Sequence, residues 1–332
     1  MQWWGVSWAN LLAIIVAACS GEKDDATALW RGPHLGFPVV PYPADALPSE
    51  ERVALGRKLF FDPGLSIDST VSCGTCHKPE LAFTDGLEKS IGHAGQTTAR
   101  NAPTLFNVAW HPYFFKEGGN PRLESQMLGP LENPEEMAVN VPMLIDRINA
   151  HSEYRKLFKK AYGVDTVDFY HLSRAIATYE RTLVSGFSRW DAWYYLGEKS
   201  LTEDELSGWR LFTGKAGCIS CHNGPDLTDY SLQNIGLHEK YEDVGLFRRT
   251  RDSADIGKMK TPTLRNLIYT APYMHDGSVL TLESVVEHYN SGGKNHPARS
   301  PLIRPLMLTD EEKSQLVAIL KAFSDTVMPV RK

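Results

Sequence analysis

Two short cysteine motifs constrain the fold of this chain more than any other feature. Each has two cysteines separated by two residues and followed at once by a histidine: Cys73, Cys76 and His77, then Cys218, Cys221 and His222. Two cysteines at this spacing can form thioethers with both vinyl groups of one porphyrin, and the adjacent imidazole can ligate the iron. The sequence therefore predicts two covalently attached c-type haems, with His77 and His222 as proximal ligands.

Two other uses of paired cysteines fit this chain less well. A zinc ribbon places its cysteine pairs about 15–20 residues apart, whereas these pairs lie in opposite halves of the chain. A redox-active thiol pair does not need a histidine after each motif. We therefore expect all four cysteines to hold haem and no disulfide framework to form.

The fifth cysteine, Cys19, ends an apolar run over residues 11–18 that is too short to cross a bilayer. Such a run is typical of an export signal, and residues 16–19 resemble the cleavage site of a bacterial lipoprotein, whose cysteine is lipidated. Residues 1–10 lack the usual Lys or Arg, so an uncleaved N-terminus with an incidental cysteine is the alternative. We expect an export signal over residues 1–19, a lipid anchor at Cys19 as the only membrane contact, and a periplasmic location.

Helix signals dominate the remainder of the chain. Thr202 with Glu205, and Thr309 with Glu312, have the capping-box spacing, and Ser49 is a plain N-cap before two glutamates. The predicted helices cover residues 50–60, 141–161, 168–185, 203–213, 282–290 and 310–323. No convincing run has the alternation of a half-buried strand. We therefore predict an all-α protein with long irregular loops rich in Gly and Pro.

The two halves share a short plan, in which a helix ends in Leu-Phe shortly before the haem motif. Residues 56–60 show this plan in the first half, and residues 208–212 show it in the second. We infer two related cytochrome c-like domains, each with one covalently bound c-type haem, and hypothesise a duplication. The expected boundaries are a linker over 20–46, an N-terminal domain over 47–190 and a C-terminal domain over 191–332.

The distribution of charge excludes one class of partner. The formal net charge is −5 at pH 7, and the sequence contains no basic block or stripe. Nucleic-acid binding depends on clustered Lys and Arg side chains that neutralise phosphates. We therefore expect no nucleic-acid partner.

The sequence around the two motifs resembles the bacterial di-haem cytochrome c peroxidase and MauG family over about residues 48–325. Several strings occur in the family's order: LGRKLF (55–60), RNAPTL (100–105), QMLGP (126–130), NPEEM (133–137), ATYERTL (177–183), PTLRN (262–266) and PYMHDG (272–277). The resemblance implies that the N-terminal domain carries the peroxidatic haem. It also implies that the C-terminal domain carries the electron-transfer haem.

The resemblance implies catalytic functions for two polar residues of the N-terminal half. By position, Gln126 and Glu136 match the distal glutamine and glutamate of the family's peroxide pocket. Breaking the O–O bond requires a base that takes a proton from one oxygen and returns it to the other, and one carboxylate can do both. We expect Glu136 to be this acid–base and Gln126 to position the oxygens. The alternative is that Glu136 is a solvated loop carboxylate beside Glu135.

The resemblance also implies a calcium ion between the haems. Asn101 and the backbone carbonyls of Thr270 and Pro272 match the family's ligands. Oxygen ligands of this kind suit Ca²⁺, with water completing the shell. Ordinary loop structure is the alternative at each of the three positions.

His93 matches the histidine that caps the iron of the resting peroxidatic haem in the peroxidases. MauG-like members lack this histidine and keep an open site. His93 is therefore either an axial ligand or a solvent-facing histidine in a flexible loop.

The second haem differs from that of the peroxidases, which use a Met ligand where this chain has Tyr289. Tyr289 shares one helix face with Leu282, Val285 and Val286, whereas His288 points about 100° away. MauG has a tyrosine ligand at this haem, and an anionic oxygen ligand favours ferric iron. We expect Tyr289 to be the axial ligand, with an ordinary core tyrosine as the alternative.

Lys116 replaces the tryptophan that the family usually has between the haems. A lysine cannot relay electrons as an indole can. Phe114, Phe115 and Trp110 are the candidates to replace it.

We predict a di-haem peroxidase that reduces hydrogen peroxide to water. The electron donor is expected to be a small redox protein, such as a monohaem cytochrome c or a cupredoxin, and a homodimer is possible on the family's pattern. One alternative is a MauG-like oxidase that uses peroxide equivalents on an organic or protein substrate. The second is a di-haem electron carrier without enzymatic activity.

Overall fold

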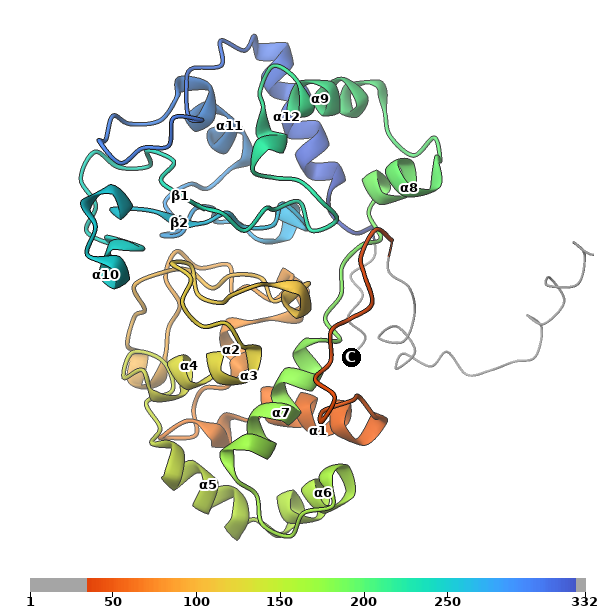
Figure 1. Ribbon diagram of the computed structural model, residues 1–332, viewed down its shortest axis with the longest axis vertical. Helices are drawn as coiled ribbons and strands as arrows, with labels where there is room; N and C mark the ends of the chain where they lie inside the picture. Colours follow the sequence, from red (N-terminus) through yellow and green to blue (C-terminus); the bar gives the residue numbers. More distant parts are fainter. Residues whose placement is uncertain (1–34, 327–332) are drawn as a thin grey trace, which may run out of the picture.

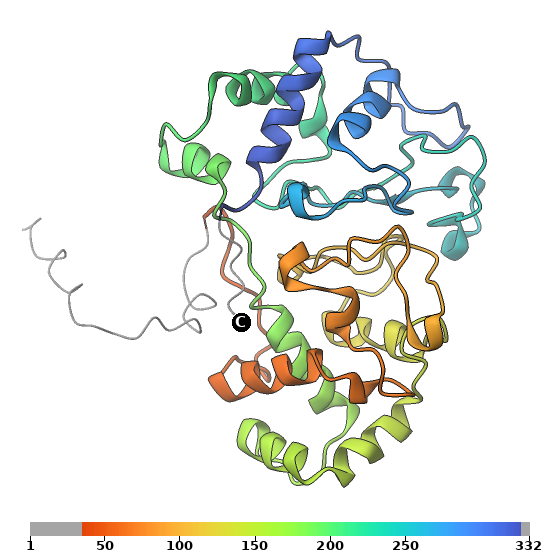
Figure 2. The ribbon, with the colours of Figure 1, turned by 180° about the vertical axis from the view of Figure 1, so that it is seen from behind.

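The structure is a computed structural model that describes residues 35–326. The predicted export signal, Cys19 and most of the predicted linker lie outside the described residues. The described chain forms two lobes stacked along the long axis of the molecule (Figures 1 and 2). Residues up to α7 make the lower lobe in Figure 1, and residues from α8 onward make the upper lobe.

The elements of both lobes are mainly helical, as the sequence predicts. The N-terminal lobe contains α1 (Glu50–Phe60), α2 (Cys73–Cys76), α3 (Leu123–Gln126), α4 (Leu128–Glu132), α5 (Val141–Ala150), α6 (Ser152–Tyr162) and α7 (Phe169–Glu180). The C-terminal lobe contains α8 (Arg189–Leu196), α9 (Glu203–Thr213), α10 (Phe247–Thr250), α11 (Leu282–Ser291) and α12 (Asp310–Ala322).

Short 3₁₀ turns and one small sheet complete the described fold. The turns are η2 (Pro63–Leu65), η3 (Pro79–Leu81), η4 (His93–Gly95), η5 (Val108–Trp110), η6 (Cys218–Ser220), η7 (Ser253–Asp255) and η8 (Leu267–Tyr269). Strands β1 (Leu232–Gln233) and β2 (Met259–Lys260) pair antiparallel, with Leu232 opposite Lys260. This pair is the only sheet among residues 35–326.

Capping residues begin the helices where the sequence predicts them. The Thr202 hydroxyl accepts from the Glu205 amide at 3.3 Å, and the Glu205 carboxylate accepts from the Thr202 amide at 2.8 Å. Thr309 and Glu312 form the same reciprocal pair at the start of α12. Ser49 caps α1 by accepting from the Arg52 amide. Local hydrogen bonds therefore determine these boundaries.

Two predicted helices are shorter than expected. The range 141–161 divides into α5 and α6, because the backbone at His151 is extended between them. The range 168–185 contains α7, which ends at Glu180. The chain then turns toward the other lobe, and the Ser185 amide donates to the side-chain oxygen of Asn107, a residue of the N-terminal lobe, at 2.9 Å.

The two lobes repeat the same helix crossing. A β-carbon at Gly56 of α1 would lie 2.0 Å from the backbone oxygen of Ala175 in α7. A β-carbon at Gly208 of α9 would lie 2.0 Å from the backbone oxygen of Gln315 in α12. Only glycine permits so close a crossing without displacement of a helix. The matching glycines support the hypothesis of a duplication.

A second repeated feature lies where the lobes meet. Asn107 and Asn266 each precede a 3₁₀ turn with a left-handed backbone, at a φ of 62° in both cases. Both side chains are fully buried. Asn107 donates to the Asp226 carboxylate at 2.8 Å, and Asn266 donates to the Ser185 hydroxyl at 2.8 Å. These buried hydrogen bonds join segments that are far apart in the sequence.

The chain passes between the lobes just before α8, which contacts α12 in the C-terminal lobe. Ser188 forms an isolated bridge with Asp325 near the end of the described chain. This crossing lies close to the predicted boundary between residues 190 and 191. The division into two independently folding domains stays a prediction.

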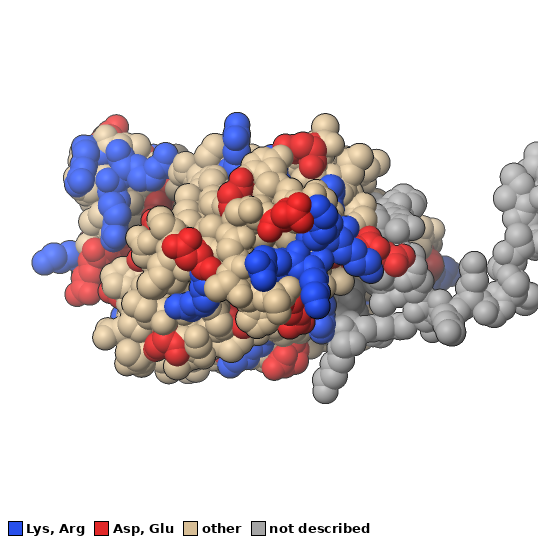
Figure 3. All heavy atoms as spheres, turned by 90° about the horizontal axis from the view of Figure 1, so that it is seen from below, with Lys and Arg blue, Asp and Glu red and all other residues tan. Residues whose placement is uncertain are grey.

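The surface shows no continuous basic stripe in the view from below. Many of the basic side chains gather in two groups, others lie separately, and acidic side chains are interspersed among them (Figure 3). None of the helices within residues 35–326 is both long enough and apolar enough to cross a membrane.

Candidate functional site

A cavity of about 970 Å³ is lined by residues of both lobes. This volume is at the upper end of the range of about 300–1,000 Å³ for small-molecule sites. Both cysteine motifs line it, through Cys76, His77, Cys218, Cys221 and His222. The cavity therefore brings together the two motifs that the sequence places in opposite halves.

The two histidines have the surroundings expected of proximal haem ligands. The Nδ1 atom of His77 lies 2.8 Å from the Phe83 carbonyl oxygen, and that of His222 lies 3.0 Å from the Leu227 carbonyl oxygen. Donation to a carbonyl from Nδ1 leaves the Nε2 lone pair available for a metal. Burial lowers the pKa of both imidazoles and so favours the neutral, ligating form.

The four cysteines of the motifs are free of disulfides. Burial raises the pKa of Cys76 to about 11 and that of Cys218 to about 12. Thiols without a disulfide are available to form thioethers with a porphyrin, as the two motifs predict.

The predicted catalytic residues line the same cavity as His77. Gln126 ends α3, and Glu136 lies in the loop after α4. The Asn133 amide donates to Glu136 Oε1 at 2.8 Å. Burial raises the pKa of the Glu136 carboxyl, and the hydrogen bond from Asn133 opposes part of this shift. Glu136 is thus a partly buried carboxyl of a loop that lines the cavity, and its catalytic function stays a prediction.

Glu180 is a second carboxyl of the cavity, and the sequence analysis did not single it out. It is 6% exposed, lies at the end of α7 and contributes to the cavity lining. Burial raises the pKa of Glu180 to about 8, against the opposing charge of Arg181. The sequence carried one signal for Glu180: it is a charged residue within the apolar stretch that forms α7, where charged side chains are rarely buried without a partner.

The helix face that carries Tyr289 lines the cavity, as its spacing predicts. Leu282, Val285, Val286 and Tyr289 all contribute to the lining. His288 points elsewhere, and its Nε2 atom lies 3.1 Å from the Ile235 carbonyl oxygen. Burial and the neighbouring Cys218 and Cys221 raise the pKa of Tyr289. Tyr289 therefore lies on the side of the second haem motif, and its ligation of iron stays a prediction.

His93 lies outside the set of described residues that line the cavity. Its Nε2 atom is 3.0 Å from the Pro134 carbonyl oxygen, and its Nδ1 atom is 3.6 Å from an Asp68 carboxylate oxygen. In this arrangement both ring nitrogens face protein oxygens. A function of His93 as an axial ligand stays a prediction that requires movement of its loop.

The three predicted calcium ligands line one cavity, but two of their oxygens already have partners within the chain. Asn101, Thr270 and Pro272 all line the cavity. The Asn101 amide nitrogen donates to the Pro272 carbonyl at 3.0 Å, and its oxygen accepts from the ammonium of Lys116. Two of the expected ligand oxygens are therefore engaged by N–H donors of the chain itself. The calcium site stays a prediction.

Aromatic residues line the cavity near Lys116. Phe114 and Phe115 contribute to the lining, whereas the Trp110 indole donates to the Pro38 carbonyl at 3.2 Å. His111 also lines the cavity and lies nearly parallel to Phe114, with ring centroids 6.1 Å apart. Of the three candidates to replace the tryptophan, Phe114 and Phe115 are therefore the two that reach the cavity.

Comparisons with known proteins agree on one family. A family model for di-haem cytochrome c peroxidases matches residues 50–200. The methylamine utilization protein MauG of Methylorubrum extorquens is 36% identical, with 95% of this chain and 93% of that protein covered. The cytochrome c551 peroxidase of Nitrosomonas europaea is 37% identical, with 86% of this chain and 84% of that protein covered.

A solved structure gives the same result. The crystal structure of a MauG-like protein associated with microbial copper homeostasis superposes with a TM-score of 0.84 at 36% identity. The superposition covers 89% of this chain and 95% of that one. Two c-type haems follow from membership of this family, and the paired histidines and free thiols of the cavity fit them. The chain belongs to the di-haem cytochrome c peroxidase family and is a peroxidase-type oxidoreductase.

Proposed function

We propose that the protein reduces hydrogen peroxide to water at the N-terminal haem, with electrons that enter through the C-terminal haem. The observation that carries this proposal is the desolvated Glu136 carboxyl, which lines one cavity with Gln126 and His77. The bound haems would supply the redox chemistry that breaks the O–O bond. The chain itself supplies the proton transfer and the orientation of peroxide.

Glu136 is suited to move a proton between the two oxygens of peroxide. Reduction of one peroxide to two waters takes up two protons and two electrons. A carboxyl whose pKa is raised by burial can both accept and return a proton closer to neutral pH than an exposed one. The side-chain amide of Asn133 donates to Oε1 of Glu136, so Oε2 of Glu136 is the oxygen that would exchange a proton with peroxide. Gln126 offers an amide donor and acceptor to orient peroxide beside it.

We propose a periplasmic protein tethered by a lipid at Cys19. A small redox protein, such as a monohaem cytochrome c or a cupredoxin, donates the electrons, and a homodimer stays a prediction from the family's pattern. The apolar run before Cys19 supports export, and the names of the peroxidase relatives support a redox-protein donor. A Cys19→Ser variant recovered in the soluble periplasmic fraction would support the anchor.

The Glu136→Gln variant of the holoprotein tests the proposed function. We expect the rate of peroxide reduction to fall by about 10²- to 10⁴-fold, as when a general acid–base is removed. Glu135→Gln is the matched control. The side chain of Glu135 is exposed, and the backbone amide of Glu135 forms the hydrogen bond to the Asn133 side-chain oxygen. A Glu136→Gln protein with the wild-type rate would remove the assignment.

A MauG-like oxidase is the second candidate, and the position of Tyr289 on the cavity supports it. One equivalent of peroxide added to the all-ferric protein separates the two candidates. A prompt spectral change would favour the oxidase, because the N-terminal iron would be open without prior reduction. A response only after half-reduction would favour the peroxidase with a capping His93.

A further inference from the structure

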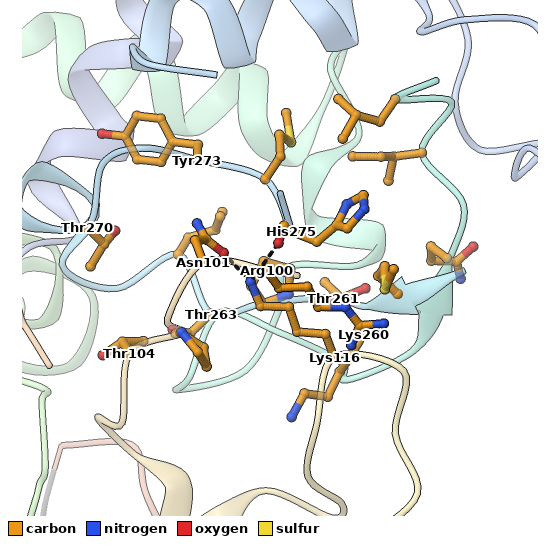
Figure 4. A pocket seen from close by; sticks show the side chains of 18 of the residues that line it. Arg100, Asn101, Thr104, Lys116, Lys260, Thr261, Thr263, Thr270, Tyr273 and His275 are labelled. Carbon is orange, nitrogen blue, oxygen red and sulfur yellow. Dashed lines mark hydrogen bonds between the residues drawn. The ribbon is translucent and has the colours of Figure 1, made fainter. Parts of the chain in front are cut away.

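Lys116 occupies the place between the lobes where the sequence predicts a calcium ion. Its Nζ atom donates to the side-chain oxygen of Asn101 and, at 3.1 Å, to the backbone carbonyl of His275 (Figure 4). Asn101 belongs to the N-terminal lobe and His275 to the C-terminal lobe. An amide oxygen and a backbone carbonyl are also ligand types that Ca²⁺ takes in proteins. The ammonium therefore binds oxygens of the kind that a bound calcium ion would need.

The backbone of Lys116 is held in the same region. Its carbonyl oxygen accepts from the backbone amide of Lys260, the last residue of β2. The side chain and the backbone of Lys116 thus both attach an N-terminal loop to the C-terminal lobe. This double attachment fixes where the ammonium lies.

Three carboxylates act on this partly buried lysine. The charges of Asp276, Asp243 and Asp85 favour the ammonium form, whereas burial and the charge of Arg100 oppose it and lower the pKa of Lys116 overall. The side chain is therefore held by its two hydrogen bonds, to Asn101 and to the His275 carbonyl, and not by a surplus of negative charge.

A second cation does not fit beside this ammonium. The Asn101 amide nitrogen donates to the Pro272 carbonyl, and the Asn101 oxygen faces Lys116. A calcium ion bound to these two oxygens would lie within a few ångströms of the lysine nitrogen. Two cations so close together repel strongly in a partly buried site, where water screens their charges poorly.

We infer that Lys116 is a covalently tethered cation that takes the place of calcium between the lobes. The protein then keeps its fold and its haem environment without a divalent ion. The lysine is a positioning residue that holds Asn101 and the 272–277 loop together. This inference is independent of whether the haems act in a peroxidase or an oxidase.

The first test uses the wild-type holoprotein. We expect metal analysis of the purified protein, before any chelator is added, to find no bound calcium. We also expect the Tm and the haem absorption spectrum to be the same before and after dialysis against EGTA. One calcium per chain, whose removal lowers the Tm, would overturn the inference.

The second test uses Lys116→Ala, which removes the ammonium and leaves room for an ion. We expect a lowered Tm that millimolar Ca²⁺ restores, because Asn101 and the carbonyls can then turn to the added cation. Lys260→Ala is the matched control. It removes a second buried lysine of the same cavity, whose Nζ atom donates to the Tyr113 carbonyl at 3.1 Å. Its Tm should not respond to Ca²⁺.

Two outcomes of the second test would contradict the inference. Lys116→Ala with an unchanged Tm would show that the ammonium holds nothing together. If Lys116→Ala lowers the Tm and added Ca²⁺ does not restore it, Asn101 and the His275 carbonyl do not form a cation site. If the variant cannot be isolated, the response of the wild-type protein to EGTA decides alone.

Discussion

The guanidinium of Arg265 binds the carboxylate of Asp191 through two parallel hydrogen bonds, at 2.7 and 2.8 Å, and both side chains are fully buried. The pair joins the loop before η8 to helix α8. Arg265 also donates to the Pro225 carbonyl at 2.7 Å, just after the second haem motif. This ion pair thus connects the haem-binding segment to the start of the C-terminal lobe.

Removal of Arg265 should destabilise the protein severely. We expect Arg265→Met to lower the free energy of unfolding by about 3–5 kcal/mol, because Asp191 keeps a buried charge without its main partner. Arg189→Met is the control, since Arg189 pairs with Glu205 but its side chain is 41% exposed. That variant should lose about 1 kcal/mol or less. Denaturant unfolding of both holoproteins measures the difference, and equal losses would refute the prediction.

A methyl group at Gly208 should separate two helices. The added β-carbon would lie 2.0 Å from the backbone oxygen of Gln315, so α9 must move away from α12. We expect Gly208→Ala to cost about 1–3 kcal/mol, although alanine is the better helix former. The control is Ser207→Ala, one residue earlier on α9. A Gly208→Ala protein as stable as this control would show that the crossing relaxes freely.

Glu180 should make stability depend on pH. Its pKa in the folded protein is raised to about 8, whereas an unfolded glutamate titrates near 4.5. Between these values the folded state binds the extra proton, so stability falls as pH rises, by up to about 1.4 kcal/mol per pH unit. As pH rises from about 5 to about 8, the Tm of the wild-type protein should therefore fall relative to the Tm of Glu180→Gln. The exposed Glu203→Gln variant provides the control, and a parallel loss of Tm in all three proteins would argue against the shift.

Loss of the Tyr289 hydroxyl should change the second haem alone. If Tyr289 ligates that iron, Tyr289→Phe removes the oxygen ligand and raises the reduction potential of this haem. Redox titration monitored by absorbance measures the effect. Tyr273→Phe is the control, because Tyr273 lines the same cavity but its hydroxyl donates to the Leu267 carbonyl at 2.9 Å. An unchanged potential in Tyr289→Phe would leave Tyr289 as a core residue.

Features that depend on local sequence were predictable here. The starts of α9 and α12 follow from capping boxes, and the position of Tyr289 follows from helix periodicity. The extended backbone at His151 was not predictable, because apolar periodicity continues across it. The sequence also indicated the two haem motifs, since covalent attachment fixes the spacing of their residues.

Features that depend on contacts between distant loops could not be predicted. The ring of His93 faces the Pro134 carbonyl, which is 41 residues away in the sequence. Lys116 bonds to the His275 carbonyl across 159 residues. Neither partner is visible in a local pattern, because the first contact joins two loops of the N-terminal lobe and the second joins the two lobes. Glu180 was overlooked for a similar reason, since its burial comes from the packing of α7.

The shared cavity links haem attachment to the contact between the lobes. The lobes are joined by hydrogen bonds such as those of Asn107 with Asp226 and of Arg100 with Asp243. A porphyrin attached at each motif would occupy the space between the lobes, because both motifs line the one cavity. We therefore expect the lobes of the apoprotein to be held together less firmly than those of the holoprotein, with the two haems completing the interface.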